Sequence, residues 1–331
     1  MVLDPVIAAR LHLLEGISSW DEAREDGRTA RRLAAFTAGT GSYSPPDVEV
    51  DESTLDARNG PLTVRVYRPR GEPSGAAGLV WLHGGGFTAG SLDARDADTF
   101  SREVCQRAAT TVVSVGYHLC QGDVRYPVPH EDAVDAWRWA YERSDQLGVP
   151  DGRWAVGGAS SGGNLAAGAA LRMRDEGGPA LPCLLVLVYP ALYRVPPPTD
   201  PELAAKLARL PGLVRIDGRK LADVFSLYYD EGAGPVPPYV SPGDADLEGL
   251  PPVLVVTSEY DDLRASGEMF AKQLEQVGVP CTYRLARGMV HGHLNQEPTL
   301  AEVSRTLQWV TQALRDQAAS RSPAAEATPG A

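Results

Sequence analysis

The chain has 331 residues, of which 43% are hydrophobic and 22% charged, and its formal net charge is −12. This composition is typical of a globular protein with a large core, and the acidic balance argues against nucleic acid or an anionic membrane as a partner. No apolar run approaches the roughly 18 residues of a membrane span, and residues 1–14 lack the pattern of a signal peptide. The four cysteines lie far apart without metal-ligand spacing, so we expect a cytoplasmic protein with reduced thiols and no metal.

Strand and helix signals alternate along most of the chain. Residues 1 to about 40 have the spacing of amphipathic helices and end at the turn-rich residues 39–42. Two period-two runs at 48–50 and 62–67, separated by the turn signal Asn59-Gly60, predict an antiparallel pair at one edge of a sheet. Further strands are expected at 78–82, 110–115, 154–157, 184–189, 253–257 and 281–285, with helices at 97–108, 131–147, 162–174, 265–277 and 299–314. This order predicts an α/β fold with a mostly parallel central sheet flanked by helices.

One long segment interrupts the alternation. Residues 191–240 are rich in proline yet contain two helix-like stretches, at 201–210 and 219–229. Because an excursion of this length between two strands is often a lid, we expect an insertion into a main α/β domain of residues 46–190 and 241–317. The Ala, Ser, Pro and Thr composition of residues 318–331 predicts a disordered tail.

The strongest local motif is Gly-Ala-Ser-Ser-Gly at residues 158–162, between a predicted strand and a predicted helix. It fits the G-x-S-x-G pattern of a nucleophile elbow, in which flanking glycines allow a sharp turn that holds the serine hydroxyl above the sheet. Ser160 is the expected nucleophile, and Ser161 is the alternative, although its own frame begins with Ala159 instead of glycine. A glycine-rich turn with incidental serines is the non-catalytic interpretation.

A second glycine motif, His-Gly-Gly-Gly-Phe at residues 83–87, follows the strand expected at 78–82. Consecutive glycines let backbone N–H groups approach an oxyanion, and this motif followed later by G-x-S-x-G is typical of lipases and esterases. A phosphate-binding loop would carry Lys-Ser or Lys-Thr after the glycines, and none follows here. We expect His83, Gly84 and Phe87 to support the loop.

A serine hydroxyl needs a general base. In proteins that carry the G-x-S-x-G motif after a strand, the chain order is the serine, then the acid, then the histidine base. Only His291 and His293 come after Ser160. We favour His291, because the residues on both sides of it suit a close approach, and we expect His293 to be structural or to border the pocket.

The acid that orients the base is expected at the end of the strand predicted at 253–257. Asp261 and Asp262 are the candidates there, and Glu259 is a weaker one. We expect Asp261 to face the base and Asp262 to act as the N-cap of the following helix.

In this order the motifs resemble the hormone-sensitive-lipase family of bacterial esterases, which have the α/β-hydrolase fold. The resemblance runs from about residue 64 to the last helix and includes Tyr-Pro at 189–190, Tyr-Val-Ser-Pro at 239–242, Leu-Pro-Pro at 250–252 and Glu-Tyr-Asp-Asp-Leu-Arg at 259–264. It implies hydrolysis of short-chain carboxylic esters through an acyl-enzyme, without cofactor, and a helical cap made of residues 1–45 and 191–240. It also implies the site residues: a triad of Ser160, Asp261 and His291, and oxyanion N–H donors from Gly85, Gly86 and Ser161.

The chain departs from the family pattern beside the expected site. Ala159 and Ser161 flank the nucleophile, His118 stands where the family usually has arginine, and His293 where it has phenylalanine. These departures bear on the substrate more than on the mechanism, and an amidase or formamidase using the same triad is an alternative. A non-catalytic small-molecule receptor is another, but it would be expected to lack a triad member. The expected partner is a small-molecule ester, and the sequence leaves a monomer and a homodimer both open.

Overall fold

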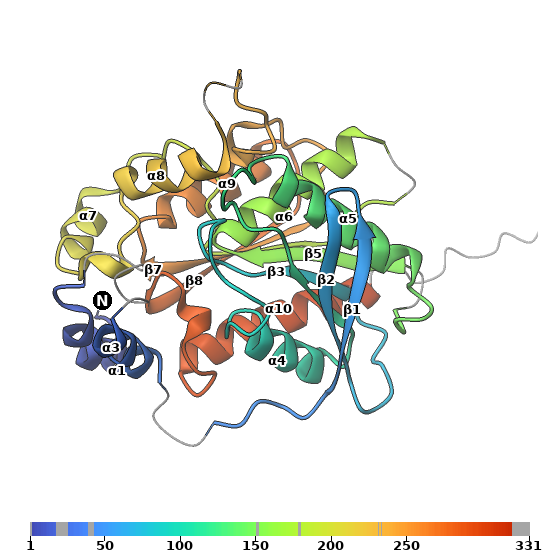
Figure 1. The fold of residues 1–331 in the computed structure, drawn as a ribbon, viewed down its shortest axis with the longest axis horizontal. Helices are drawn as coiled ribbons and strands as arrows, with labels where there is room; N and C mark the ends of the chain where they lie inside the picture. Colours follow the sequence, from blue (N-terminus) through green and yellow to red (C-terminus); the bar gives the residue numbers. More distant parts are fainter. Residues whose placement is uncertain are drawn as a thin grey trace, which may run out of the picture.

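A computed structural model describes residues 2–17, 26–38, 43–149, 152–177, 180–230, 232 and 234–319. Its centre is an eight-stranded sheet in the order β1-β2-β4-β3-β5-β6-β7-β8 (Figure 1). The strands are β1 (Glu49–Ala57), β2 (Gly60–Arg68), β3 (Gly78–Leu82), β4 (Val112–Gly116), β5 (Trp154–Ala159), β6 (Leu185–Val188), β7 (Val253–Tyr260) and β8 (Cys281–Val290). β2 pairs antiparallel with β1 and β4, and all the other neighbouring strands are parallel. The predicted α/β fold and its antiparallel edge are confirmed.

Helices cover both faces of the sheet. Figure 1 shows α5, α6 and α9 above it and α4 and α10 below it. The bounds are α4 (Asp98–Ala108), α5 (Val128–Glu142), α6 (Ser161–Asp175), α9 (Arg264–Gln276) and α10 (Ala301–Ala319). Because both faces are covered, the central strands are apolar without alternation: all five residues of β3 and all eight of β7 are buried.

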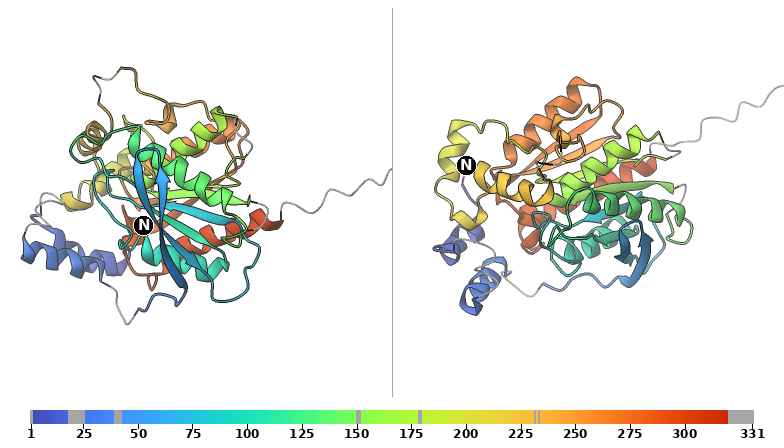
Figure 2. Two further views of the ribbon diagram at one scale, coloured as in Figure 1. Left: turned by 45° about the vertical axis from the view of Figure 1, so that its right-hand side comes forward. Right: turned by 45° about the horizontal axis from the view of Figure 1, so that its top comes forward.

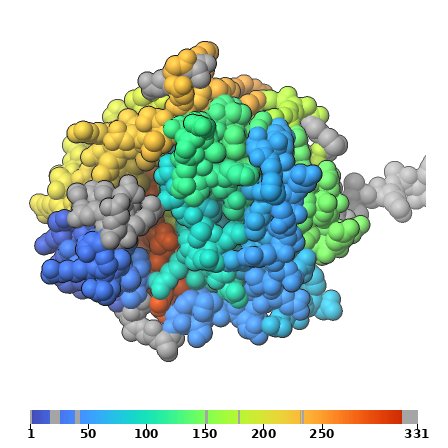
Figure 3. All heavy atoms as spheres, viewed as in Figure 1, coloured from blue at the N-terminus to red at the C-terminus, as the bar shows by residue number. Residues whose placement is uncertain are grey.

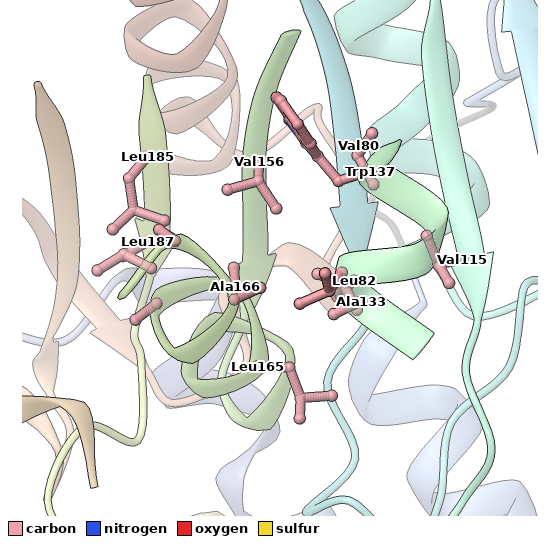
Figure 4. Close-up of a cluster of buried hydrophobic side chains, with 14 of the residues drawn as sticks. Val80, Leu82, Val115, Ala133, Trp137, Val156, Leu165, Ala166, Leu185 and Leu187 are labelled. Atoms are coloured by element: carbon pink, nitrogen blue, oxygen red, sulfur yellow. The ribbon is translucent and has the colours of Figure 1, made fainter. Parts of the chain in front are cut away.

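The larger hydrophobic core lies between the sheet and the helices α5 and α6. Figure 4 shows side chains of β3, β4, β5 and β6 meeting those of the two helices there. The small residues of α6 allow this helix to lie close to the strands, and twelve of its residues are buried. The close packing holds the first turn of α6 at a fixed height above the end of β5.

Four further helices gather at one end of the sheet. They are α1 (Pro5–Arg10) and α3 (Gly27–Thr37) from the N-terminal region, and α7 (Pro201–Leu207) and α8 (Gly218–Tyr228) from the insertion. The short 3₁₀ turn η1 (Leu11–Leu14) follows α1, and η3 (Gly212–Val214) lies between α7 and α8, whereas η5 (Pro242–Asp244) and η6 (His293–Asn295) come later in the chain. Figures 1 and 2 show the N-terminal helices below α7 and α8 at this end. In the space-filling view, atoms of the C-terminal part of the chain reach the surface beside these helices (Figure 3).

Several elements differ in extent from the sequence prediction, and β1, predicted at 48–50, runs over Glu49–Ala57. β8 continues to Val290, because Met289 and Val290 are buried beyond the exposed Arg287. α5 begins at Val128, with Pro129 in its first turn, where a missing N–H costs nothing, and it ends at Glu142. The expected turn at residues 39–42 and residues 320–331 of the expected tail lie outside the described residues.

Candidate active site

Ser160 lies in the turn between β5 and α6. Its backbone has φ +55° and ψ −116°, a conformation that non-glycine residues rarely adopt and that marks functional turns. A Cβ on Gly158 would lie 2.3 Å from the backbone of Gly162, and one on Gly162 would lie 2.2 Å from the carbonyl oxygen of Leu82. Both glycines of the motif are therefore required by backbone contacts, and they hold the Ser160 side chain at the sheet end.

A hydrogen-bond chain joins three side chains from three different loops. His291 Nε2 lies 3.0 Å from Ser160 Oγ, and His291 Nδ1 lies 2.8 Å from Asp261 Oδ2. The Asp261 side chain is 1% exposed and that of His291 is 13% exposed, so the acid is buried while the base borders solvent. The structure thus brings together the residues expected as nucleophile, base and acid, which are 131 and 30 positions apart along the two bonds.

The alternative base lies elsewhere. His293 is buried, with Nδ1 2.9 Å from Ser258 Oγ and Nε2 3.0 Å from Thr306 Oγ1. Burial, together with the neighbouring His291, lowers the pKa of His293 to about 3. A neutral ring bonded to two hydroxyl groups links β7 to α10, so His293 occupies a structural position.

The other acidic candidates are also engaged elsewhere. Glu259 is buried and its Oε2 accepts a hydrogen bond of 2.7 Å from Gly288 N. The expectation that Asp262 caps α9 is wrong: the N-cap position is Leu263, without a side-chain cap bond, and Asp262 binds Arg215 of the insertion. The turn at this strand end points the two neighbouring aspartates in different directions, which periodicity does not predict.

The glycine loop after β3 has the backbone that its residues require. Gly85 and Gly86 have φ of +134° and +61°, and a Cβ on Gly85 would lie 2.0 Å from the carbonyl oxygen of Ala89. None of the hydrogen bonds in the described part of the chain uses the N–H of Gly85 or Gly86. Two glycine N–H groups therefore stay available to a ligand next to the serine turn.

His83 and Phe87 support this loop from its two ends. The His83 ring donates from Nδ1 to Gly84 O at 2.8 Å and stacks on Tyr117 with ring centroids 4.4 Å apart, while the Tyr117 hydroxyl donates to His83 O. Burial lowers the pKa of His83. Phe87 is fully buried and stacks on Tyr228 of α8 at 4.0 Å, so it is a core residue between the loop and the insertion and not an open pocket wall.

Asp96 is a site residue that the sequence analysis missed. Its Oδ2 accepts a hydrogen bond of 2.9 Å from Gly84 N, and its own carbonyl oxygen accepts one of 2.6 Å from Trp81 Nε1. Burial raises the pKa of the Asp96 carboxyl, although His83 and the bond from Gly84 oppose this. The motif signal that could have revealed it is weak, since Asp96 stands twelve residues after the glycine in an irregular segment.

The arrangement is suited to acyl transfer. A serine hydroxyl bonded to an imidazole, with a buried carboxylate on the other ring nitrogen, can attack a carbonyl carbon. Glycine N–H groups beside it can bind the oxyanion that forms. The fold and the site together define an α/β hydrolase with a serine–histidine–aspartate constellation.

Comparison with known proteins agrees with this class. Residues 79–295 match the model of a family described as having the alpha/beta hydrolase fold. The chain is 32% identical to the ethyl acetate hydrolase of Pseudomonas putida over 95% of its length and 99% of the relative's, and 37% identical to the carboxylic ester hydrolase LipN of Mycobacterium tuberculosis over 88% and 77%. The solved hyperthermophilic esterase of Pyrobaculum calidifontis superposes with a TM-score of 0.82 at 32% identity, covering 97% of this chain and 100% of that one.

The chain therefore belongs to the α/β-hydrolase family, and the resemblance to the hormone-sensitive-lipase group of esterases is confirmed. Among the described helices, none combines the length and the apolar character that a membrane-spanning helix needs.

Proposed function

We propose that the protein is a serine carboxylic-ester hydrolase that acts on short-chain acyl esters through Ser160, His291 and Asp261. The observation that carries this proposal is the unbroken chain from Asp261 Oδ2 through the His291 ring to Ser160 Oγ, with contacts of 2.8 and 3.0 Å. The relatives named esterase or carboxylic ester hydrolase support the reaction class.

In the proposed reaction, Ser160 Oγ attacks the acyl carbon while His291 Nε2 takes the hydroxyl proton. Asp261 holds the Nδ1–H side of the ring and stabilises the imidazolium that forms. The N–H groups of Gly85, Gly86 and Ser161 bind the tetrahedral oxyanion. His291 then returns the proton to the departing alcohol, leaving an acyl-enzyme, and a water activated by the same base releases the carboxylic acid and regenerates Ser160.

The preference for a short acyl chain is supported by the position of α8. The methyl carbons of Val224 lie 3.5 and 3.6 Å from the point that a Cβ on Gly86 would occupy. The stacking of Tyr228 on the buried Phe87 fixes the same helix against the glycine loop. A substrate carbonyl in the oxyanion site would therefore have an apolar wall directly beside it, which limits the space for a long chain.

We also propose that residues 1–45 and 191–240 form a cap on a catalytic domain of residues 46–190 and 241–317. Both ends of the insertion are bonded to one buried side chain: Asn164 Nδ2 of α6 donates to Ala191 O at 2.8 Å and to Val240 O at 3.0 Å. The N-terminal segment reaches the end of β8, the strand that precedes the base, since Asp4 N donates to Gly288 O at 3.0 Å. These contacts support a cap that is anchored to both sides of the candidate site.

The test is hydrolysis of p-nitrophenyl esters from acetate to decanoate by the wild type, Ser160→Ala and the control Ser53→Ala on the distant strand β1. We expect activity that is highest for short chains, unchanged in the control, and lower by about a thousandfold or more in Ser160→Ala. Retention of the rate in Ser160→Ala would contradict the proposal. A matched pair of ester and anilide substrates separates the esterase from the amidase interpretation.

A further inference from the structure

Asp262, the neighbour of the proposed catalytic acid, is bound by the insertion. Its Oδ2 lies 2.8 Å from Arg215 Nε and 2.8 Å from Ile216 N, and its Oδ1 lies 2.8 Å from Arg215 Nη2. The two charged side chains are only 11% and 22% exposed. A forked guanidinium–carboxylate pair of this kind fixes orientation as well as distance, because two parallel N–H···O bonds must form together.

The same turn presents Asp261 to the base. Asp261 Oδ1 accepts a hydrogen bond of 2.9 Å from Leu263 N, and its Oδ2 is the partner of His291 Nδ1. Asp261 and Asp262 share one peptide plane, so an Asp262 side chain held in place restricts the backbone rotation that would swing the Asp261 carboxylate. The Asp261 carboxylate is thus held directly by the N–H of Leu263, and its backbone is held through the neighbouring Asp262.

Arg215 is itself held in a defined place on the insertion. Its Nη1 donates to Leu207 O at the end of α7, at a distance of 2.8 Å. The two preceding residues, Leu213 and Val214, are buried in the core that α7 shares with the sheet. A shift of the insertion would therefore move the Arg215 side chain and, with it, its partner Asp262.

We propose that Arg215 is a positioning residue for the catalytic acid: through Asp262 it fixes the turn that presents Asp261 to His291. This inference rests on the proposed triad function. If Arg215 has this role, the position of the insertion affects the rate of the chemical step as well as the binding of substrate. A tether that merely kept the insertion over the pocket would affect KM and stability, and would leave kcat at saturating substrate unchanged.

The experiment compares kcat and KM for p-nitrophenyl acetate in the wild type, Arg215→Ala, Arg215→Lys and Asp262→Asn. We expect Arg215→Ala to lower kcat by about tenfold or more with KM within about twofold, since small displacements of a catalytic group have large effects. Arg215→Lys should recover only part of kcat, because a lysine cannot make the forked pair. The downfield proton resonance of the Asp261–His291 hydrogen bond should broaden in Arg215→Ala.

Lys206→Ala is the matched control. It also removes an ion pair of the insertion, the 2.7 Å contact with Glu202, but this pair lies within α7 and does not involve Asp262. It should keep the wild-type kcat and the downfield resonance. Asp262→Asn retains the side-chain size and an acceptor for Ile216 N, so it tests the proposal even if Arg215→Ala does not fold.

An unchanged kcat in Asp262→Asn, or a rise in KM alone in Arg215→Ala, would overturn the proposal. An equal loss of kcat in Lys206→Ala would also overturn it. Ser160→Ala in the same series tests the proposed function separately: if it is inactive while Arg215→Ala keeps full kcat, the triad stands and only the positioning role fails.

Discussion

We expect the buried side chain of His130 to make the stability of the protein depend on pH. The ring is fully buried on α5, stacks parallel to Tyr239 at 5.3 Å, and neither nitrogen has a hydrogen-bond partner among the described residues. Burial, together with the nearby charges of Arg172 and Arg58, lowers the pKa of His130 to about 3. The side chain is thus held neutral in the folded state, and we expect His130→Phe to remove this contribution while keeping the ring stack.

The sign of the effect follows from where the proton binds. An unfolded-state histidine has a pKa of about 6.5, so between pH 6.5 and 3 the unfolded chain binds a proton that the folded chain does not, and stability falls as pH falls. Between pH 7.5 and pH 5.0 the free energy of unfolding falls by about 2 kcal/mol, because each pH unit below 6.5 stabilises the unfolded state by about 1.4 kcal/mol. His293, with its pKa also lowered to about 3, adds a similar loss in both proteins, so it cancels from the comparison.

The assay is equilibrium urea unfolding of the wild type and His130→Phe at pH 7.5 and 5.0. The wild type should lose about 2 kcal/mol more than the variant between the two pH values. His12→Phe, at an exposed position of the N-terminal region, is the control and should lose as much stability as the wild type. The reasoning is refuted if His130→Phe and the wild type lose the same free energy of unfolding.

Two further predictions concern Gly162 and Asp96, which lie beside the candidate site. Gly162→Ala should lower the free energy of unfolding by about 3 kcal/mol or prevent folding, because its Cβ would lie 2.2 Å from Leu82 O and 2.4 Å from His83 O. Gly212→Ala, with nothing within 4 Å, should be nearly neutral in the same urea experiment, and equal losses would contradict this. Asp96→Ala should lower kcat about a hundredfold by freeing the loop that presents the oxyanion donors, whereas Asp96→Asn keeps an acceptor and should keep most of kcat. Equal kcat values for the two Asp96 variants at saturating substrate would argue against a role in holding that loop.

Short-range sequence signals were sufficient for the sheet and for the two glycine motifs. A buried strand followed by G-x-S-x-G predicts a sharp turn between the strand and a helix, so residues 154–162 were enough to predict the elbow at Ser160. The order of parallel strands then brings the ends of β3, β5, β7 and β8 to one edge, and with them the residues predicted as nucleophile, base and acid. These predictions depend on steric rules that act within a few residues, so they can be made from a single sequence.

The roles of Asp262 and Asp96 needed the tertiary structure. Asp261 and Asp262 are adjacent and chemically identical, yet one bonds to His291 and the other to Arg215, 47 positions away. Asp96 looks like an ordinary loop carboxylate until its bond to the glycine loop is seen. Each of these roles is a contact between segments distant in sequence, and a hydrogen bond depends on distance and direction that only the packed chain defines. The local sequence does not specify that geometry, so the partners of Asp262 and Asp96 became known only from the fold.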